Sequence, residues 1–125
     1  MPFRYLIDSD RRIVFSTYSG RLTDTDIIGH ADCLRADPLF QPHFRQLTDT
    51  RDVVAVDVTP HGIRRIAKSN PFAASARRAL ITDSRFIYGL TRMYETLIGI
   101  QPCSNEDQTL VSTDPGEARA WLGLD

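Results

Sequence analysis

The chain has little cysteine and no long apolar run. Its 125 residues include two cysteines, Cys33 and Cys103, which lie far apart in the sequence. A chain of this kind is typical of a reducing compartment, so we expect free thiols and a cytoplasmic protein. No apolar stretch approaches the roughly 18 residues of a membrane-spanning helix, and the first ten residues lack the apolar core of a secretory signal. We therefore predict no membrane span and no export.

An excess of charge of one sign is also missing. The 15 Lys and Arg residues are balanced by 16 Asp and Glu residues, for a net charge of −1. Dedicated nucleic-acid binders usually present a broad basic surface, so this composition argues against a nucleic-acid partner. The hydrophobic fraction of 42% is ordinary for a globular protein, and the length suits one core. We predict a single domain over residues 1–125.

Recognisable catalytic motifs are absent as well. The sequence has no serine nucleophile elbow, no phosphate-binding glycine loop and no dinucleotide fingerprint. His30 and Cys33 are spaced so that both could contact one metal ion on a helix, but His43 and His61 lie in unrelated segments. We therefore predict no catalytic residues, no metal and no cofactor. An enzyme is the third hypothesis, because it needs a pocket with convergent polar groups.

The first third of the chain predicts a hairpin followed by a helix. Residues 3–8 and 13–18 are rich in β-branched and aromatic side chains and are separated by polar turn residues. Gly20 is expected to end the second strand. Thr23 is then placed to cap a helix, with Asp26 reaching back as a short capping box.

The rest of the sequence alternates between short apolar strands and helical stripes. Residues 46–49 predict a short third strand, and residues 53–56 either extend it or form a separate one. Thr59 and Pro60 mark the next helix start, since proline is well placed in a first helical turn. With further strands at residues 78–82 and 109–113, the predicted order is ββαβαβαβα. Because each helical return places strands in parallel, we predict an α/β fold with a mixed sheet covered by helices.

Three segments resemble a known family. They are Gly20-Arg21-Leu22-Thr23, Leu47-Thr48-Asp49 and the Glu117-Ala118-x-x-Trp121-Leu122 finish. Together with the element order, they resemble small bacterial STAS-like proteins with the SpoIIAA-like, anti-sigma-factor-antagonist fold, and the resemblance covers nearly all of the chain. It implies a regulatory module without catalysis that docks a protein partner through a strand-to-helix loop.

In some members of that family a hydroxyl in an Asp-Ser-Ser-Gly-like element is phosphorylated at a helix N-terminus. The matching segment here is Asp57-Val58-Thr59-Pro60, in which Thr59 keeps the second hydroxyl while valine and proline replace the first serine and the glycine. The resemblance thus implies Thr59 as a phosphorylation site. Our leading hypothesis is an interaction module whose exposed loop surface contains Asp49, Arg51, Asp57 and Thr59.

A second branch of similar folds binds lipids or other apolar molecules between sheet and helices. That branch motivates the alternative hypothesis of a sensor or carrier of an apolar ligand. Five aromatic residues either line such a cavity or form the ordinary core: Phe40, Phe44, Phe72, Phe86 and Tyr94.

The longest predicted helix carries a mixed face with Tyr88, Arg92 and Met93. Tyrosine, methionine and arginine are enriched at protein interfaces. We predict that this face reaches solvent or a second subunit in a homodimer.

Overall fold

The computed structural model describes the backbone of residues 2–99 and 109–124, and the side chains of residues 2–92 and 109–124. Its order of elements is ββαβαβαβα, which confirms the prediction. The elements are β1 (Phe3–Asp8), β2 (Ile13–Thr23), α1 (Asp24–Ala36), β3 (Arg45–Asp57), α2 (Pro60–Ser69), β4 (Arg78–Ile81), α3 (Arg85–Gly99), β5 (Thr109–Ser112) and α4 (Pro115–Trp121).

The strands of the described residues form one five-stranded sheet in the order β1-β2-β3-β4-β5. β1 and β2 are antiparallel, whereas the β2–β3, β3–β4 and β4–β5 pairs are parallel. A tight turn can join antiparallel neighbours, but parallel neighbours need a crossover, and α1, α2 and α3 supply the three crossovers. The mixed sheet with an opening hairpin is therefore confirmed.

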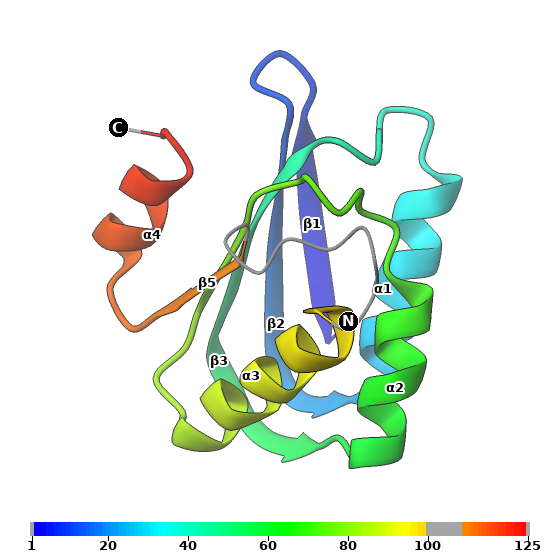
Figure 1. Ribbon diagram of the computed structural model, residues 1–125, viewed down its shortest axis with the longest axis vertical. Helices are drawn as coiled ribbons and strands as arrows, with labels where there is room; N and C mark the ends of the chain where they lie inside the picture. Colours follow the sequence, from blue (N-terminus) through cyan, green and yellow to red (C-terminus); the bar gives the residue numbers. More distant parts are fainter. Residues whose placement is uncertain (1, 100–108, 125) are drawn as a thin grey trace.

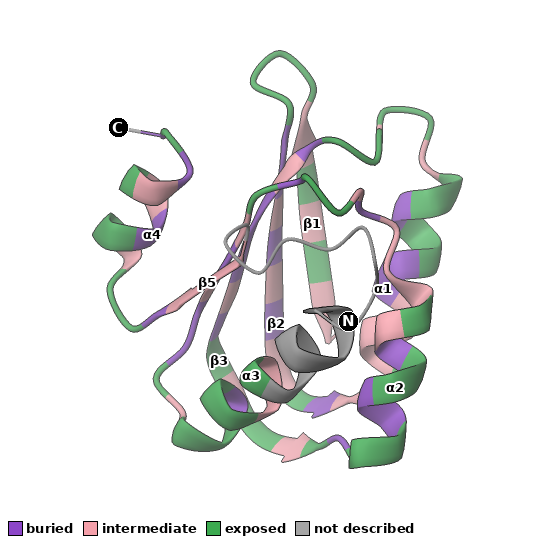
Figure 2. Cartoon of the chain, in the orientation of Figure 1, coloured by how far each residue is buried: buried purple, intermediate pink, exposed green. Residues whose placement is uncertain are grey.

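The helices cover the two faces of the sheet unequally. α1, α2 and α3 lie on one face, and α4 lies on the other (Figure 1). Neighbouring residues of a strand point to opposite faces, so Ile13 packs with Leu47 and with Leu122 next to α4, while Val14 packs with Leu34 of α1. α1 and α2 bury the side turned toward the sheet and expose the other (Figure 2).

Local capping chemistry sets two of the helix starts. The amide of Asp26 donates to Thr23 Oγ1 at 3.1 Å, and the amide of Thr23 donates to Asp26 Oδ2 at 3.3 Å, which completes the predicted capping box. At α2 the amide of Gly62 donates to Thr59 Oγ1 at 3.0 Å, and Pro60 occupies the first turn. Both predicted helix starts are confirmed.

The second and third strands are longer than the sequence pattern predicts. The prediction that Gly20 ends the second strand is wrong, because β2 continues to Thr23 with Gly20 at φ +70°. Glycine tolerates this left-handed conformation, so the strand changes register with β3 beside Gly20 and then continues. Residues 53–56 extend β3 and do not form a separate strand.

β3 reaches well past its neighbour β4. Its pairing with β4 ends at Asp49 opposite Ile81, whereas its pairing with β2 continues to Asp57 opposite Thr23. The far half of β3 leads directly into the cap of α2 at Thr59. This extension places α2 over the sheet and, with α3, builds the walls of the site described next.

Candidate functional site

A cavity of about 130 Å³ lies between the sheet and the helices α2 and α3. Its wall is aliphatic: Leu22 comes from the end of β2, Ile63 and Ile66 come from the inner face of α2, and Ile87 and Leu90 come from α3. Ile63 and Ile66 are one helical turn apart, so the amphipathic pattern of α2 turns both toward the sheet. The wall can therefore surround an apolar group and exclude water from it.

The floor of this cavity is polar. It includes Gln46, Thr48 and Thr50, which are alternate residues of β3 and so point to the same face of the sheet, and Arg78 at the start of β4. Thr50 Oγ1 donates to the carbonyl of Ile81 at 2.8 Å, which satisfies a buried hydroxyl. The site thus combines an apolar wall with a small number of polar groups, as small-molecule sites commonly do.

A second cavity of about 40 Å³ adjoins the first, and Tyr18, Gln46 and Arg78 line both. The smaller cavity also has His30 from α1 and Asn70 from the end of α2 in its lining. The same polar side chains therefore separate a mainly apolar compartment from a more polar one.

A chain of hydrogen bonds connects these polar groups. Ser16 Oγ lies 2.9 Å from His30 Nε2 and accepts from Gln46 Nε2 at 3.1 Å. Arg78 Nε donates to Gln46 Oε1 at 3.1 Å, and its Nη1 donates to Asn70 Oδ1 at 3.3 Å. These contacts hold the floor side chains in place, because each polar group in this series of hydrogen bonds has a partner.

His30 is the most strongly perturbed of these groups. Its side chain is 3% exposed and is surrounded by the rings of Phe3, Tyr5 and Tyr18, with centroids 5.3 to 5.6 Å from its own. Burial, with a smaller contribution from the positive charge of Arg78, lowers the pKa of His30 to about 4. At neutral pH the imidazole is therefore uncharged.

The sequence leaves five aromatic residues either as a cavity lining or as ordinary core. Phe40, Phe44 and Phe72 pack together with Val14 and Leu34, and of these three Phe72 also lines the smaller of the two cavities. The side chain of Phe86 is 57% exposed, and Tyr94 lies outside the described side chains. Of the two alternatives for these aromatic residues, Phe40, Phe44 and Phe72 take the core position. Phe86 takes neither, because helical spacing turns Ile87 and Leu90 inward and Phe86 outward.

Most residues of the predicted loop surface lie in a strand. Asp49, Arg51 and Asp57 lie in β3 and not in a loop, while Thr59 is in the connection to α2. The two aspartates are eight positions apart, which corresponds to roughly 25 Å along an extended strand. The four residues therefore do not form one compact cluster.

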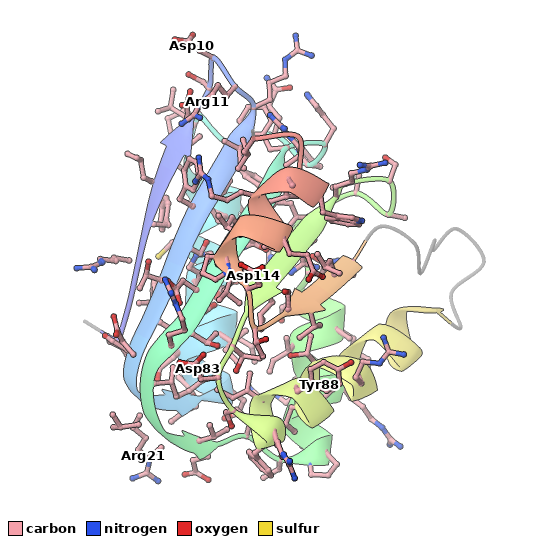
Figure 3. The ribbon with its side chains drawn as sticks, turned by 90° about the vertical axis from the view of Figure 1, so that its left-hand side faces the viewer. Asp10, Arg11, Arg21, Asp83, Tyr88 and Asp114 are labelled. Atoms are coloured by element: carbon pink, nitrogen blue, oxygen red, sulfur yellow. The ribbon has the colours of Figure 1, made fainter. Side chains whose placement is uncertain are left out.

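Each of these aspartates has an arginine partner. Arg51 Nη2 donates to Asp49 Oδ2 at 2.7 Å, and the hydrogen bonds from Arg51 hold the pKa of Asp49 below its ordinary value. Asp57 pairs with Arg21, which lies at the end of the sheet opposite the turn that contains Asp10 and Arg11 (Figure 3). Both pairs are exposed, so they contribute little to stability and remain accessible to a partner.

The structure separates His30 and Cys33, the two residues whose helical spacing would let both contact one metal ion. His30 points into the interior, whereas Cys33 is an exposed free thiol. Nowhere in residues 2–92 and 109–124 do three His, Cys, Asp or Glu side chains gather as a metal site. Among the described helices, none combines the length and apolar character that crossing a bilayer requires.

The residues of the predicted dimer face lie on α3. Tyr88 and Arg92 are exposed, and Tyr88 projects from the helix (Figure 3). The side chain of Met93 lies outside the described part of the chain. The homodimer stays a prediction.

Sequence reasoning missed the polar floor. Gln46 and Arg78 are register partners at the starts of β3 and β4, and both point to the face that α1, α2 and α3 cover. The sequence signal for such residues is a polar side chain at one of the alternate, inward-facing positions of a strand, since buried polar groups need specific partners.

The sheet order and the helix layers define a SpoIIAA-like fold. Among solved structures, the chain is similar to an uncharacterized protein of the DUF3478 family with a SpoIIAA-like fold from Shewanella loihica PV-4. The two are 16% identical, the match covers 96% of this chain and 91% of that one, and the TM-score is 0.57. No family model and no curated protein matches the chain. The comparison therefore establishes the fold, which confirms the fold expected from the resemblance.

Proposed function

We propose that this protein is a non-catalytic regulatory module that binds an apolar small molecule, or the apolar part of a lipid, in the cavity between the sheet and α2 and α3. The observation that carries the proposal is the aliphatic wall around a space of about 130 Å³. A cavity of about 150 Å³ lined by aliphatic and aromatic side chains can bind benzene, so this space suits a ring or a short alkyl chain.

A filling variant tests the cavity directly. Val58 lines it and is buried, so Val58→Phe introduces a ring into the space that the ligand would occupy. The matched control is Val54→Phe, because Val54 is 85% exposed and four residues away. With toluene as the probe and amide chemical shifts as the signal, we expect saturable binding in the wild type and in the control, and loss of binding in Val58→Phe.

Two results would overturn this function. One is the absence of saturable toluene shifts in the wild-type protein, and the other is equal binding by Val58→Phe in a protein that unfolds cooperatively. Native mass spectrometry of the protein purified from its own cells, with lipid extraction, then identifies the natural ligand.

A second candidate function is protein docking at the far end of β3. The observation that favours it is the exposure of Val54 beside the Asp57–Arg21 pair and the Thr59 cap. A strand that extends past its neighbour presents backbone groups that a partner chain can pair with. Alanine at both Asp57 and Thr59 should release a co-purifying partner, and full retention of every partner would argue against this surface.

Phosphorylation of Thr59 belongs to that second candidate. The Thr59 hydroxyl already accepts from an amide at the start of α2, where phosphate oxygens would also find amide donors. The nearby Asp57 carboxylate opposes the added charge. Phosphopeptide mass spectrometry of the protein from native cells tests the modification.

The proposal also includes a cytoplasmic location and a homodimer across α3. The exposed thiol of Cys33 supports a reducing compartment, and the exposed side chains of Phe86 and Tyr88 support a contact surface on α3. Cell fractionation tests the first, and sedimentation as a monomer at tens of micromolar would reject the second.

A further inference from the structure

We propose that the ligand is an apolar molecule with one hydroxyl group, which forms a hydrogen bond with Thr48 while the apolar part occupies the aliphatic cavity. This inference rests on the proposed function and adds to it the chemical class of the ligand. It follows from the burial of Thr48, from its place in the cavity floor, and from the hydrogen bonds of the groups around it.

Thr48 carries a buried hydroxyl in the floor of the larger cavity. It is 7% exposed and lies between Gln46 and Thr50, the alternate residues of β3 that point to the same face of the sheet. Its register partners in the neighbouring strands are Ser16 of β2 and Leu80 of β4. The side chain therefore lies inside the floor, where little of it is accessible to bulk water.

The hydrogen-bonding capacity of the Thr48 side chain is unused in residues 2–92 and 109–124. Its hydroxyl forms no hydrogen bond with any part of the chain that the structure describes. A buried hydroxyl without a partner is costly, because it has lost its hydrogen bonds to water and gained none in return. A ligand that bonds to Thr48 removes this cost.

Two other hydroxyls of the lining already have partners. Thr50 Oγ1 donates to the carbonyl of Ile81, and Thr91 Oγ1 donates to the carbonyl of Ile87, each at 2.8 Å. The proton of each of these hydroxyls is therefore committed, whereas Thr48 can both donate and accept. Thr48 is thus the hydroxyl through which the floor can select a ligand.

The amide and guanidinium groups of the floor are engaged as well. Gln46 accepts from Arg78 and donates to Ser16. Arg78 also donates to Asn70. A charged ligand would have to displace such contacts or remain unpaired beside an aliphatic wall, and both are costly. An uncharged hydroxyl at Thr48 leaves these contacts in place.

A hydroxyl group is chemically matched to Thr48. It can donate to the Thr48 oxygen or accept the Thr48 proton, so it makes the kind of hydrogen bond that a water molecule would make there. A methyl group of similar size leaves Thr48 without a partner. The aliphatic wall surrounds a space of about 130 Å³, which suits a ring or a short chain. The lining as a whole therefore suits a phenol or a short alcohol.

The experiment compares phenol with toluene, in which a methyl group replaces the hydroxyl. Each is titrated into the full-length wild-type protein at pH 7, with amide chemical shifts as the readout. In a cavity without a partner for the hydroxyl, phenol would bind roughly five- to a hundredfold more weakly than toluene. We expect phenol to bind as tightly as toluene to within about threefold, or more tightly, because Thr48 supplies that partner.

Variants at Thr48 assign the phenol affinity to its hydroxyl. Thr48→Val replaces the hydroxyl by a methyl group, so it should weaken phenol binding roughly five- to a hundredfold and change toluene binding by less than about threefold. Thr48→Ser keeps the hydroxyl and should keep the wild-type ratio of the two affinities. Thr17→Val is the matched control, because Thr17 follows Ser16 in the neighbouring strand and so points to the opposite face of the sheet. Thermal unfolding of each variant verifies that it is folded.

The outcomes separate this inference from the function on which it rests. Wild-type protein that binds toluene, and binds phenol more than about threefold more weakly, overturns the inference and leaves the apolar cavity supported. That comparison needs no variant. Unchanged phenol binding in folded Thr48→Val, or an equal loss in Thr17→Val, also overturns the inference. Failure of toluene and phenol alike overturns both the inference and the proposed function.

Discussion

Acidification from pH 7 to pH 5 is expected to destabilise the protein through His30. This imidazole is almost completely buried, and its pKa in the folded chain is lowered to about 4, below the ordinary histidine value of 6.5. Between these two values the unfolded chain binds a proton that the folded chain does not bind. The free energy of unfolding must therefore fall as the pH falls through this window, and the loss is complete once the pH is below the folded pKa.

The size of the effect follows from the two pKa values. The expected loss is about 2 kcal/mol between pH 7 and pH 5, and it approaches roughly 3 kcal/mol near pH 4. The pKa values of Asp8 and Asp49 are also lowered, but from an ordinary value of 3.8, so their contributions are lost at pH values below this window. A slope between pH 7 and pH 5 is thus a measure of His30.

Urea unfolding at pH 7 and pH 5 measures this loss. The fluorescence of Trp121, the single tryptophan, reports on the α4 layer, and far-ultraviolet circular dichroism reports on the whole chain. His30→Gln should abolish most of the pH dependence, because glutamine stays neutral and can still bond to Ser16. His61→Gln is the control, since it removes an exposed histidine from α2, and it should retain the wild-type slope.

The reasoning is refuted if the free energy of unfolding of the wild type differs by less than about 0.5 kcal/mol between the two pH values, well below the expected shift. It is refuted equally if His30→Gln keeps the full slope.

Three further substitutions test the packing and the local geometry, each by urea or thermal unfolding. Leu34→Ala should destabilise the protein by about 2 to 5 kcal/mol because Leu34 is 0% exposed. Leu39→Ala is the control, and it should change stability by no more than about 0.5 kcal/mol because Leu39 is 54% exposed. Equal effects would contradict the described core. Thr23→Ala should cost about 1 kcal/mol by removing the capping box of α1, and Thr25→Ala, two residues later and exposed, should cost less. Gly20→Ala should destabilise by roughly 1 kcal/mol because of its φ of +70° and not because of crowding, since among the described residues no atom beyond its two chain neighbours lies within 4 Å of the added Cβ. An unchanged stability would show that this backbone is not left-handed.

The cavity illustrates the limit of sequence patterns. Helical spacing predicts that an apolar stripe of α3 turns inward, but it does not tell which neighbour that stripe will meet. Ile87 lines a cavity together with Ile63 and Thr48, while Phe86, one residue earlier, is exposed. An aromatic-rich composition is therefore a poor guide to a ligand cavity, because the lining depends on direction as well as on residue type.

The residues of β3 likewise do not predict the length of this strand. Val53 to Val56 has the composition of a strand, yet only its pairing with the end of β2 makes it continuous with residues 45–49. That pairing depends in turn on the left-handed backbone of Gly20, a residue that a local pattern interprets as a strand end.

The sequence by itself determined the order of strands and helices and the starts of α1 and α2. These features depend on side chains within about one helical turn, such as the Thr23–Asp26 box and the Thr59–Pro60 cap, whose partners are a few residues away. Tertiary structure alone decided the polar floor and its connection to His30, because Gln46, Arg78 and His30 are separated by many residues and meet only when β3, β4 and α1 are packed together. Local interactions depend on residues close together in the sequence, whereas a cavity is defined by the relative positions of segments that only the folded sheet brings together.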